Sequence, residues 1–276
     1  MGEEAWETAK KTFFFIITLI IAAIFAFPIL WVFLSSIKET KEVFAIPPKW
    51  IFNPTLHNYY RLIFETPFMG RFLNSLIIAV FSTAISLVLG SLTAYGFSRY
   101  EIKASNFILF WILSLRMLPV IAVVVPFYIL FYYTRLLDTH LALILVYCIF
   151  NISFTVWVMK GFFDEIPREL EEAAMLDGYS PAQVFFKVSL PLARAGLATT
   201  AIFCLIQSLN EFLVALTLTK RVAETAPVGL AKLQTALGTD WGRISAAAVI
   251  FMIPVVIFTI IVRNQLIRGM SFGRMK

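Results

Sequence analysis

The chain has 276 residues, of which 60% are hydrophobic and only 14% are charged, and its formal net charge is +6. Soluble domains carry about a quarter charged residues, so this composition excludes an ordinary water-soluble protein and favours one that is surrounded by a lipid bilayer. The basic surplus then indicates loop residues that lie near anionic lipid, and we expect no nucleic-acid partner.

Six apolar windows are long enough to cross a bilayer as helices, which takes about 20 residues each. In chain order they are Phe13–Ile37, Phe72–Phe97, Phe107–Tyr133, Leu141–Met159, Gly196–Thr219 and Ile244–Val262. None alternates with a period of two, as the strands of a membrane barrel do. The sequence therefore predicts an all-α integral membrane protein with six transmembrane helices.

The connections between these windows differ in kind. The segment 38–71 is long and polar, 220–243 is intermediate in length, and 99–106 and 134–140 are short. The segment 263–276 carries basic residues and no acidic one, which favours a cytoplasmic C-terminus. An even number of spans then places the N-terminus on the same side.

Four polar residues fall inside the predicted spans. They are Arg116, Gln207, Asn210 and Glu211. Charged groups at that depth cost about 3 kcal/mol or more, so they usually face protein or water. One interpretation places them on a translocation path or its gate; the other, which we favour, is an internal Arg116–Glu211 ion pair or hydrogen bonds between helices. In the third span, Pro119 and Pro126 predict bends.

No metal or disulfide chemistry is predicted. The cysteines Cys148 and Cys204 lie in apolar runs, and the histidines His57 and His140 are far apart without nearby ligands. The chain also lacks the Gly-rich phosphate loop of ATP-binding proteins. We expect no cofactor bound by this chain and no enzymatic activity.

The charged segment between the fourth and fifth windows predicts two short helices. Pro167 suits the first turn of a helix over Arg168–Leu176, and Gly178 can supply its left-handed C-terminal cap. Ser180, Pro181 and Gln183 have the spacing of a capping box for a second helix, which Pro191 ends or kinks.

The first of these helices has an unusual surface for a loop next to a membrane. Leu170, Ala173, Ala174 and Asp177 fall on one stripe, and the small alanines leave room for another surface to approach. Glu169, Glu171 and Glu172 add what we expect to be exposed acidic groups. A helix lying on lipid favours a basic polar face, so protein docking is the better interpretation.

The spacing of this loop resembles that of a known family. Glu172-Ala173-Ala174 is followed by three residues and Gly178, then by nine residues, Val188, one residue and Leu190-Pro191. This resembles the EAA loop of binding-protein-dependent ABC importers, with Val188 where the family usually has Ile. The surrounding GFFDEIPRELEEAAMLDG is similar to the sugar-importer branch.

Other stretches share the resemblance to the smaller membrane subunit of maltose-type sugar importers. They are FLNSLIIAVFSTAISLVLGSLTAYGFSR at 72–99, RMLPVIAVVVPFYIL at 116–130, LDTHLALIL at 137–145 and NEFLVAL at 210–216. The chain departs from the family pattern at Leu209, where Trp is usual, and at Ala195, where Pro is common.

The resemblance implies a type I ABC importer permease fold with a cytoplasmic coupling-helix loop. It implies an N-terminal helix and long extracytoplasmic loop at 1–70, a transmembrane core at 71–263 with the coupling loop at 161–194, and a basic cytoplasmic tail at 264–276. The residues implied in coupling to the ATPase are Glu172, Ala173, Ala174, Asp177, Gly178, Leu190 and Pro191.

The resemblance also implies partners and a location. Expected partners are a cytoplasmic ABC ATPase dimer that uses ATP and Mg²⁺, a second permease subunit forming a heterodimer, an extracytoplasmic solute-binding protein and membrane lipid. The expected location is a prokaryotic inner membrane, with both termini cytoplasmic.

The implied function is import of a sugar, such as a di- or oligosaccharide, by alternating access. The same machinery with a sugar phosphate, a polyol or another small polar solute stays open as an alternative. A secondary transporter independent of an ATPase often shows two similar halves, and a membrane-embedded enzyme needs clustered catalytic groups; the sequence shows neither.

Overall fold

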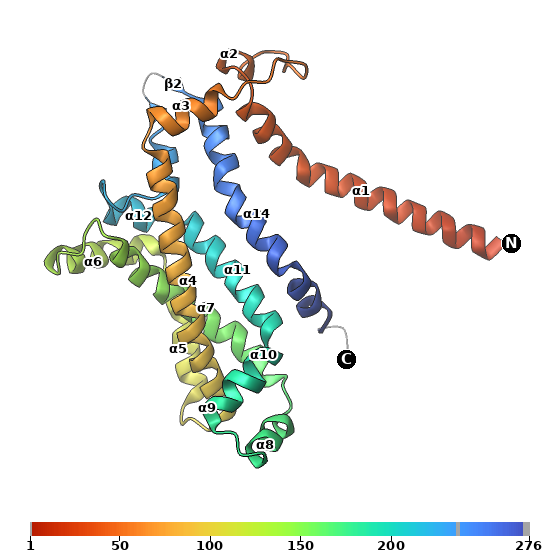
Figure 1. The fold of residues 1–276 in the computed structure, drawn as a ribbon, viewed down its shortest axis with the longest axis vertical. Helices are drawn as coiled ribbons and strands as arrows, with labels where there is room; N and C mark the ends of the chain where they lie inside the picture. The colour runs from red at the N-terminus through yellow and green to blue at the C-terminus, as the bar shows by residue number, and fades with distance from the viewer. Residues whose placement is uncertain (1, 236–237, 273–276) are drawn as a thin grey trace. The chain divides into compact units, whose positions relative to one another are not determined.

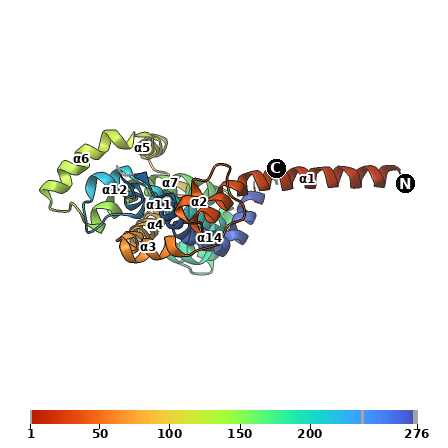
Figure 2. The ribbon, with the colours of Figure 1, turned by 90° about the horizontal axis from the view of Figure 1, so that it is seen from above.

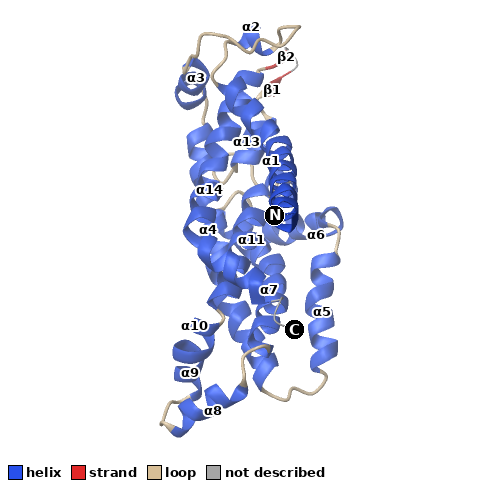
Figure 3. Ribbon diagram, turned by 90° about the vertical axis from the view of Figure 1, so that its right-hand side faces the viewer, coloured by secondary structure: helices blue, strands red, loops and turns tan. Residues whose placement is uncertain are grey.

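The computed structural model describes residues 2–235 and 238–272, and nearly all of its regular structure is helical (Figure 3). The described residues form two compact units. One contains residues up to 68 together with 232–252, and the other contains 69–231 and the residues from 253 onward. The predicted all-α class is confirmed, because the only strands among the described residues are two residues long each.

The first unit is organised around the end of a long apolar helix. Its elements are α1 (Gly2–Ser36), α2 (Thr40–Val43), α3 (His57–Glu65), the antiparallel hairpin of β1 (Gln234–Thr235) with β2 (Gly238–Thr239), and the start of α14 (Trp241–Phe272). The apolar window of α1, Lys10–Ser36, is 0% buried within the structure, and α1 runs away from α2 and α3 (Figure 2). Such a surface requires lipid or another chain to cover it.

The buried side chain of Asn58 joins the elements of this unit. Its amide donates hydrogen bonds to the carbonyls of Ser36 and Lys38, at 3.0 and 2.7 Å. A Cβ atom on Gly242 would lie 2.6 Å from the Asn58 Oδ1 atom, so a side chain at this position of α14 would displace the Asn58 amide. Asn58 therefore ties the end of α1 and the start of α14 to α3.

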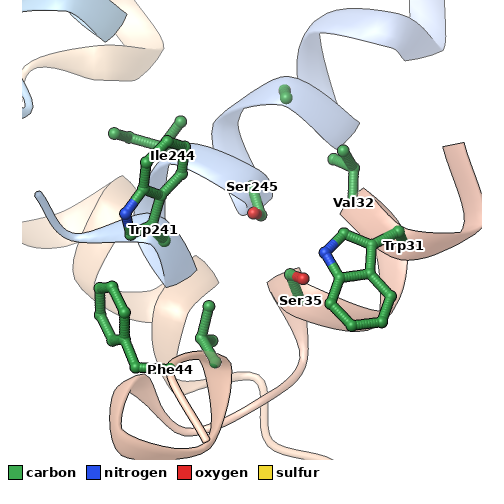
Figure 4. Close-up of a pocket in the computed structure, with 9 residues that line it drawn as sticks. Trp31, Val32, Ser35, Phe44, Trp241, Ile244 and Ser245 are labelled. Carbon is green, nitrogen blue, oxygen red and sulfur yellow. The ribbon is translucent and has the colours of Figure 1, made fainter. Parts of the chain in front are cut away.

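An apolar cavity of about 320 Å³ lies between the end of α1, α2 and the start of α14. Figure 4 shows the rings of Trp31 and Trp241 on opposite sides of it, with the hydroxyls of Ser35 and Ser245 between them. Tryptophan is enriched where a membrane meets water. This end of the two helices is therefore suited to the membrane interface.

The second unit contains the remaining helices. They are α4 (Phe68–Arg99), α5 (Ser105–Met117), α6 (Val120–Tyr133), α7 (His140–Asp164), α8 (Arg168–Leu176), α9 (Pro181–Val184), the π-helix Phe185–Ser189, α10 (Leu190–Leu192), α11 (Arg194–Asn210), α12 (Leu213–Leu218) and α13 (Ala226–Ala231). Helices α4, α7 and α11 run side by side at its centre, and α8 and α9 lie at one end of them (Figure 1).

Buried polar side chains connect the three central helices. The Ser208 hydroxyl on α11 lies 3.2 Å from that of Ser82 on α4, and it accepts a hydrogen bond of 2.8 Å from the Asn151 amide on α7. Two apolar clusters flank this point. One includes Ile78, Leu143 and Val214, and the other includes Met159 and Phe163.

The spans are less regular than predicted. Among the described residues, α1, α4, α7 and α14 are each long and apolar enough to cross a membrane. Two bent helix pairs also meet this criterion when each is taken together: Ser105–Met117 with Val120–Tyr133, and Pro181–Leu192 with Arg194–Asn210. The third predicted span is a pair of helices at 91°, broken at Leu118 and Pro119 rather than merely bent. Proline disfavours helical angles at the residue before it, and Leu118 is extended, with ψ 126°. Pro126 lies inside α6, which continues through it.

The fifth predicted span, Gly196–Thr219, is also broken. Helix α11 ends at Asn210 and α12 begins at Leu213, with Glu211 extended between them. The Glu211 carboxylate accepts hydrogen bonds from the backbone N–H groups of Val214 and Ala215, at 2.9 and 3.1 Å. A side chain that bonds to the backbone in this way offers an alternative to continuing the helix.

A carboxylate fixes the loop that follows α12. Asp138, just before α7, accepts hydrogen bonds of 3.0 to 3.2 Å from four consecutive backbone N–H groups. These belong to Lys220, Arg221, Val222 and Ala223. Partial burial opposes ionisation of Asp138, but the four donors outweigh it and hold the pKa of this carboxyl below its usual value.

We predict that Asp138→Asn destabilises the chain by about 1–3 kcal/mol at pH 7, because an amide accepts fewer of the four hydrogen bonds. Asn tolerates the left-handed backbone of position 138, where φ is 59°. Since the folded pKa is lowered, the difference from wild type should be constant near neutral pH and shrink as the pH falls below about 4. Thermal unfolding in detergent across pH measures this; a pH-independent difference would contradict the charge argument.

Helix α4 approaches α7 closely at Gly90, where an added Cβ atom would lie 2.5 Å from the Thr155 Cβ. We predict that Gly90→Ala destabilises the chain by about 1–3 kcal/mol, as overpacking does. Gly96→Ala in the same helix is the matched control, because nothing lies within 4 Å of its added Cβ. Thiol labelling of the buried Cys148 and Cys204 during heating measures both variants. Equal melting temperatures would refute the packing argument.

Candidate functional site

The loop between α7 and α11 has the helices that its sequence predicts. Helix α8 spans Arg168–Leu176, and Gly178 follows it with φ 89°, in the region that favours glycine. The capping box of α9 is formed: the Gln183 N–H donates to the Ser180 hydroxyl at 3.4 Å, and the Ser180 N–H donates to the Gln183 side chain at 2.8 Å. The loop is therefore a defined helix–turn–helix.

The second helix of the loop is longer and less regular than its capping box alone indicates. It continues through the π-helix Phe185–Ser189 and α10, and it meets α11 at 77°. Leu190 is partly buried against the cluster that contains Phe163, whereas Pro191 is exposed. Short π-helical stretches are frequent at functional sites. Here the stretch places Ser189 in the interior, facing α8.

The exposed surface of α8 and its turn gathers most of the predicted coupling residues. Glu172, Ala173, Asp177 and Gly178 are exposed, whereas Ala174 is buried. Leu176 is 90% exposed, next to the glycine turn. The predicted stripe is thus split, because Ala174 packs inward while Ala173 faces out. Leu176 thus presents its apolar side chain one helical turn from the exposed carboxylate of Glu172.

Glu171 is not the exposed acidic group that we predicted. Its side chain is 3% exposed and forms an ion pair with Arg99 of α4, with Nε and Oε2 2.8 Å apart. Tyr95 and Ser189 also donate to the carboxylate, at 3.2 and 2.6 Å. Buried charges need such partners, and Arg99 supplies one from 72 residues away along the chain.

The ion pair is part of a wider network at the end of the central helices. The Arg99 guanidinium also donates to the Ser98 hydroxyl and to the Ile166 carbonyl, at 2.9 and 3.1 Å. Ser98 in turn donates to Asp164, at the end of α7, at 2.6 Å. Burial opposes ionisation of Glu171, but the hydrogen bonds from Arg99 and Ser189 prevail and lower the pKa of its carboxyl. Helix α8 is thereby fastened to α4 and α7.

A second group of candidate residues lines a cavity of about 120 Å³ in the same unit. Arg116, Gln207 and Glu211 line it together, whereas Asn210 is exposed elsewhere and donates to the Ile206 carbonyl at 2.9 Å. Sequence reasoning missed three further polar lining residues. They are Tyr147, Asn151 and Ser208. Asn151 lies in the middle of an apolar window, and a polar residue at such a position indicates an interior or functional role.

The favoured Arg116–Glu211 ion pair is not formed within the part of the chain that the structure describes. Glu211 instead accepts a hydrogen bond of 3.0 Å from the Tyr147 hydroxyl, besides capping α12. Arg116 lies over the ring of Phe154, with its guanidinium carbon 4.3 Å from the ring centroid. Glu211 and Arg116 thus have different partners: the carboxylate caps α12, and the guanidinium lies on an aromatic ring.

We predict that Glu171→Ala destabilises the chain by about 3–5 kcal/mol, because it leaves the Arg99 charge buried without its partner. Glu172→Ala is the matched control: it removes the neighbouring, exposed carboxylate and should change stability by less than about 0.5 kcal/mol. Thermal unfolding of both variants in detergent measures this. Similar melting temperatures for the two variants would rule out the role given to the buried pair.

Comparison with known proteins places the chain in a family. Residues 86–271 match the model of the family described as binding-protein-dependent transport system inner membrane component. The trehalose transport system permease protein SugB of Mycobacterium tuberculosis is 33% identical over 271 residues, covering 97% of this chain and 98% of that protein. The sulfoquinovosyl glycerol transport system permease protein SmoH of Agrobacterium fabrum is 32% identical over 252 residues, covering 91% and 88%.

Solved structures share the fold. A chain of a bacterial ABC transporter involved in the import of the acidic polysaccharide alginate superposes with a TM-score of 0.74 at 24% identity, covering 91% of this chain and 94% of that one. A chain of the MetNI methionine ABC transporter gives 0.55 at 20% identity, covering 75% and 97%. The solved structures show that the fold is that of type I ABC importer permeases, and the family match shows that the chain belongs to the binding-protein-dependent transport system inner membrane components.

Proposed function

We propose that this permease imports a carbohydrate, a di- or oligosaccharide, which an extracytoplasmic binding protein delivers. The support is the set of relatives that match over nearly the whole chain. Their names refer to trehalose, to trehalose and maltose, and to diacetylchitobiose, at 33%, 32% and 29% identity. A sugar phosphate, a polyol or another small polar solute would use the same machinery.

The exposed tip of α8 is the proposed contact with a cytoplasmic ATPase dimer. Leu176 would insert as an apolar anchor, and the carboxylate of Glu172 would form charge-assisted hydrogen bonds with a basic residue of the ATPase. Gly178 would keep the turn compact, because its φ of 89° is strained for other residues. ATP and Mg²⁺ would be held by the ATPase, with no cofactor on this chain.

The observation that carries this proposal is the fastening of α8 to the span ends through Glu171 and Arg99. A push on the exposed tip would pass to α4 through this buried pair and to α7 through Asp164. The spans would then rock between inward-facing and outward-facing states, which is how alternating access operates in transporters. The cavity lined by Arg116, Gln207 and Glu211 would lie on the translocation path.

The remaining parts of the assembly follow from the same proposal. A second permease subunit would pair with this one, and it or lipid would cover the apolar window of α1. The chain would lie in a prokaryotic inner membrane with both termini in the cytoplasm. The segments 38–71 and 220–243 would then face the binding protein on the other side.

We predict that Glu172→Arg abolishes ATPase association and reduces ATP-driven uptake by at least about tenfold, because it places a cation against a basic cleft. Leu176→Asp should act in the same way. Glu101→Arg, an equal charge reversal in the exposed loop after α4, is the control and should leave both properties unchanged.

Co-purification in mild detergent and uptake into vesicles measure the two properties. If both α8 variants retain the ATPase and the full uptake rate, the proposed coupling surface is wrong. A chain that moves solute without any ATPase would instead indicate a secondary transporter.

A further inference from the structure

We propose that the cavity between α5, α7 and α11 recognises the acidic group of its cargo through Arg116, so that the imported saccharide is an anionic one. This inference rests on the proposed carbohydrate import and names the class of sugar. The cavity is lined by the end of α5 together with residues of α7 and α11, at the points where α5 and α11 stop. Broken helices of this kind form solute sites in transporters.

The carboxylate of this cavity is already engaged. Glu211 accepts hydrogen bonds from the Tyr147 hydroxyl and from the backbone N–H groups of Val214 and Ala215, all between 2.9 and 3.1 Å. Asn151 and Ser208 are bonded to each other at 2.8 Å. The Glu211 carboxylate therefore caps α12 and forms no ion pair with Arg116, and the rest of the polar wall is neutral and hydrogen-bonding.

The positive charge of the cavity has no such partner. Arg116 is exposed, and among the residues that the structure describes no carboxylate forms an ion pair with it. Its guanidinium carbon lies 4.3 Å from the Phe154 centroid, which orients the flat group while leaving the N–H donors at its edge available. A guanidinium presented in this way matches a carboxylate or sulfonate, which can accept two of its hydrogen bonds at once.

The position of Arg116 strengthens the requirement for an anion. It lies in the middle of the broken span formed by α5 and α6, where a charge is costly unless it is compensated. A neutral sugar could accept hydrogen bonds from Arg116 but would form no ion pair with it. The hydroxyl groups of an acidic sugar would meet the amide of Gln207, which is exposed in the same cavity.

The size of the cavity sets how much of the cargo it contacts. Its volume of about 120 Å³ is below the roughly 300–1,000 Å³ of complete small-molecule sites. This chain would therefore contact the acidic end of the saccharide, and the second permease subunit would contact the rest.

The test uses the whole importer, with both permeases, the ATPase and the binding protein, in lipid vesicles. ATP-driven uptake is measured for matched pairs of sugars that differ in their carboxylates, such as digalacturonate against galactobiose and cellobiouronate against cellobiose. We expect uptake of acidic members and not of their neutral counterparts. For the acidic sugar, Arg116→Gln should raise the KM by about tenfold or more, the effect of losing one charge-assisted pair, and Arg116→Lys should raise it less.

Lys103→Gln is the control, because it removes an equal charge from the exposed loop before α5, and it should leave the KM unchanged. Two results would overturn the anionic-cargo inference and leave carbohydrate import standing. One is uptake of neutral sugars alone, and the other is a KM for the acidic sugar that Arg116→Gln does not change. An Arg116→Gln subunit that no longer assembles with the second permease also overturns it, because the partner chain then supplies the counter-charge. Uptake of no sugar at all refutes the proposed function itself.

Discussion

The buried ion pair between Glu171 and Arg99 is the interaction on which the geometry of the loop between α7 and α11 depends. Two charges removed from water are stable only when their hydrogen bonds are satisfied, and Tyr95 and Ser189 complete the set here. Three elements must meet for this to happen: the end of α4, helix α8 and the π-helix. The end of α7 joins them through the hydrogen bond from Ser98 to Asp164. The exposed tip of α8 is held in place as a consequence, although its own side chains touch little of the core.

The loop also shows why some of this site could be predicted from the sequence and some could not. The capping box at Ser180 and the glycine turn at Gly178 are local, since their donors and acceptors lie within a few residues. Glu171 and Glu172 are neighbours in one helix, and nothing nearby distinguishes the buried one from the exposed one. The difference is made by Arg99, which is 72 residues away along the chain, and by the inward turn of Ser189 in the π-helix.

In the transmembrane part, too, some features could be predicted from the sequence and others could not. Bulk hydropathy identifies the spans, because their length and apolar content are set by the bilayer. Proline at position 119 indicates a bend but not its size of 91°. The break at Glu211 is not evident from the sequence, because the carboxylate has two possible partners: it can pair with Arg116 or cap α12. Backbone donors only three and four residues away are the nearer option, and this leaves Arg116 available.

Single helices join the loop between α7 and α11 to the cavity, which is the physical basis of the coupling that we propose. Helix α11 begins beside α10 in the coupling loop and ends at the cavity, and its 17 residues span about 25 Å at 1.5 Å per residue. Helix α7 likewise runs from Tyr147 at the cavity to Asp164 in the network around Arg99. Ser82, Asn151 and Ser208 bond these helices to each other and to α4 near the cavity. A displacement of α8 that keeps these buried polar contacts therefore moves the cavity wall, because breaking a contact leaves buried polar groups unpaired.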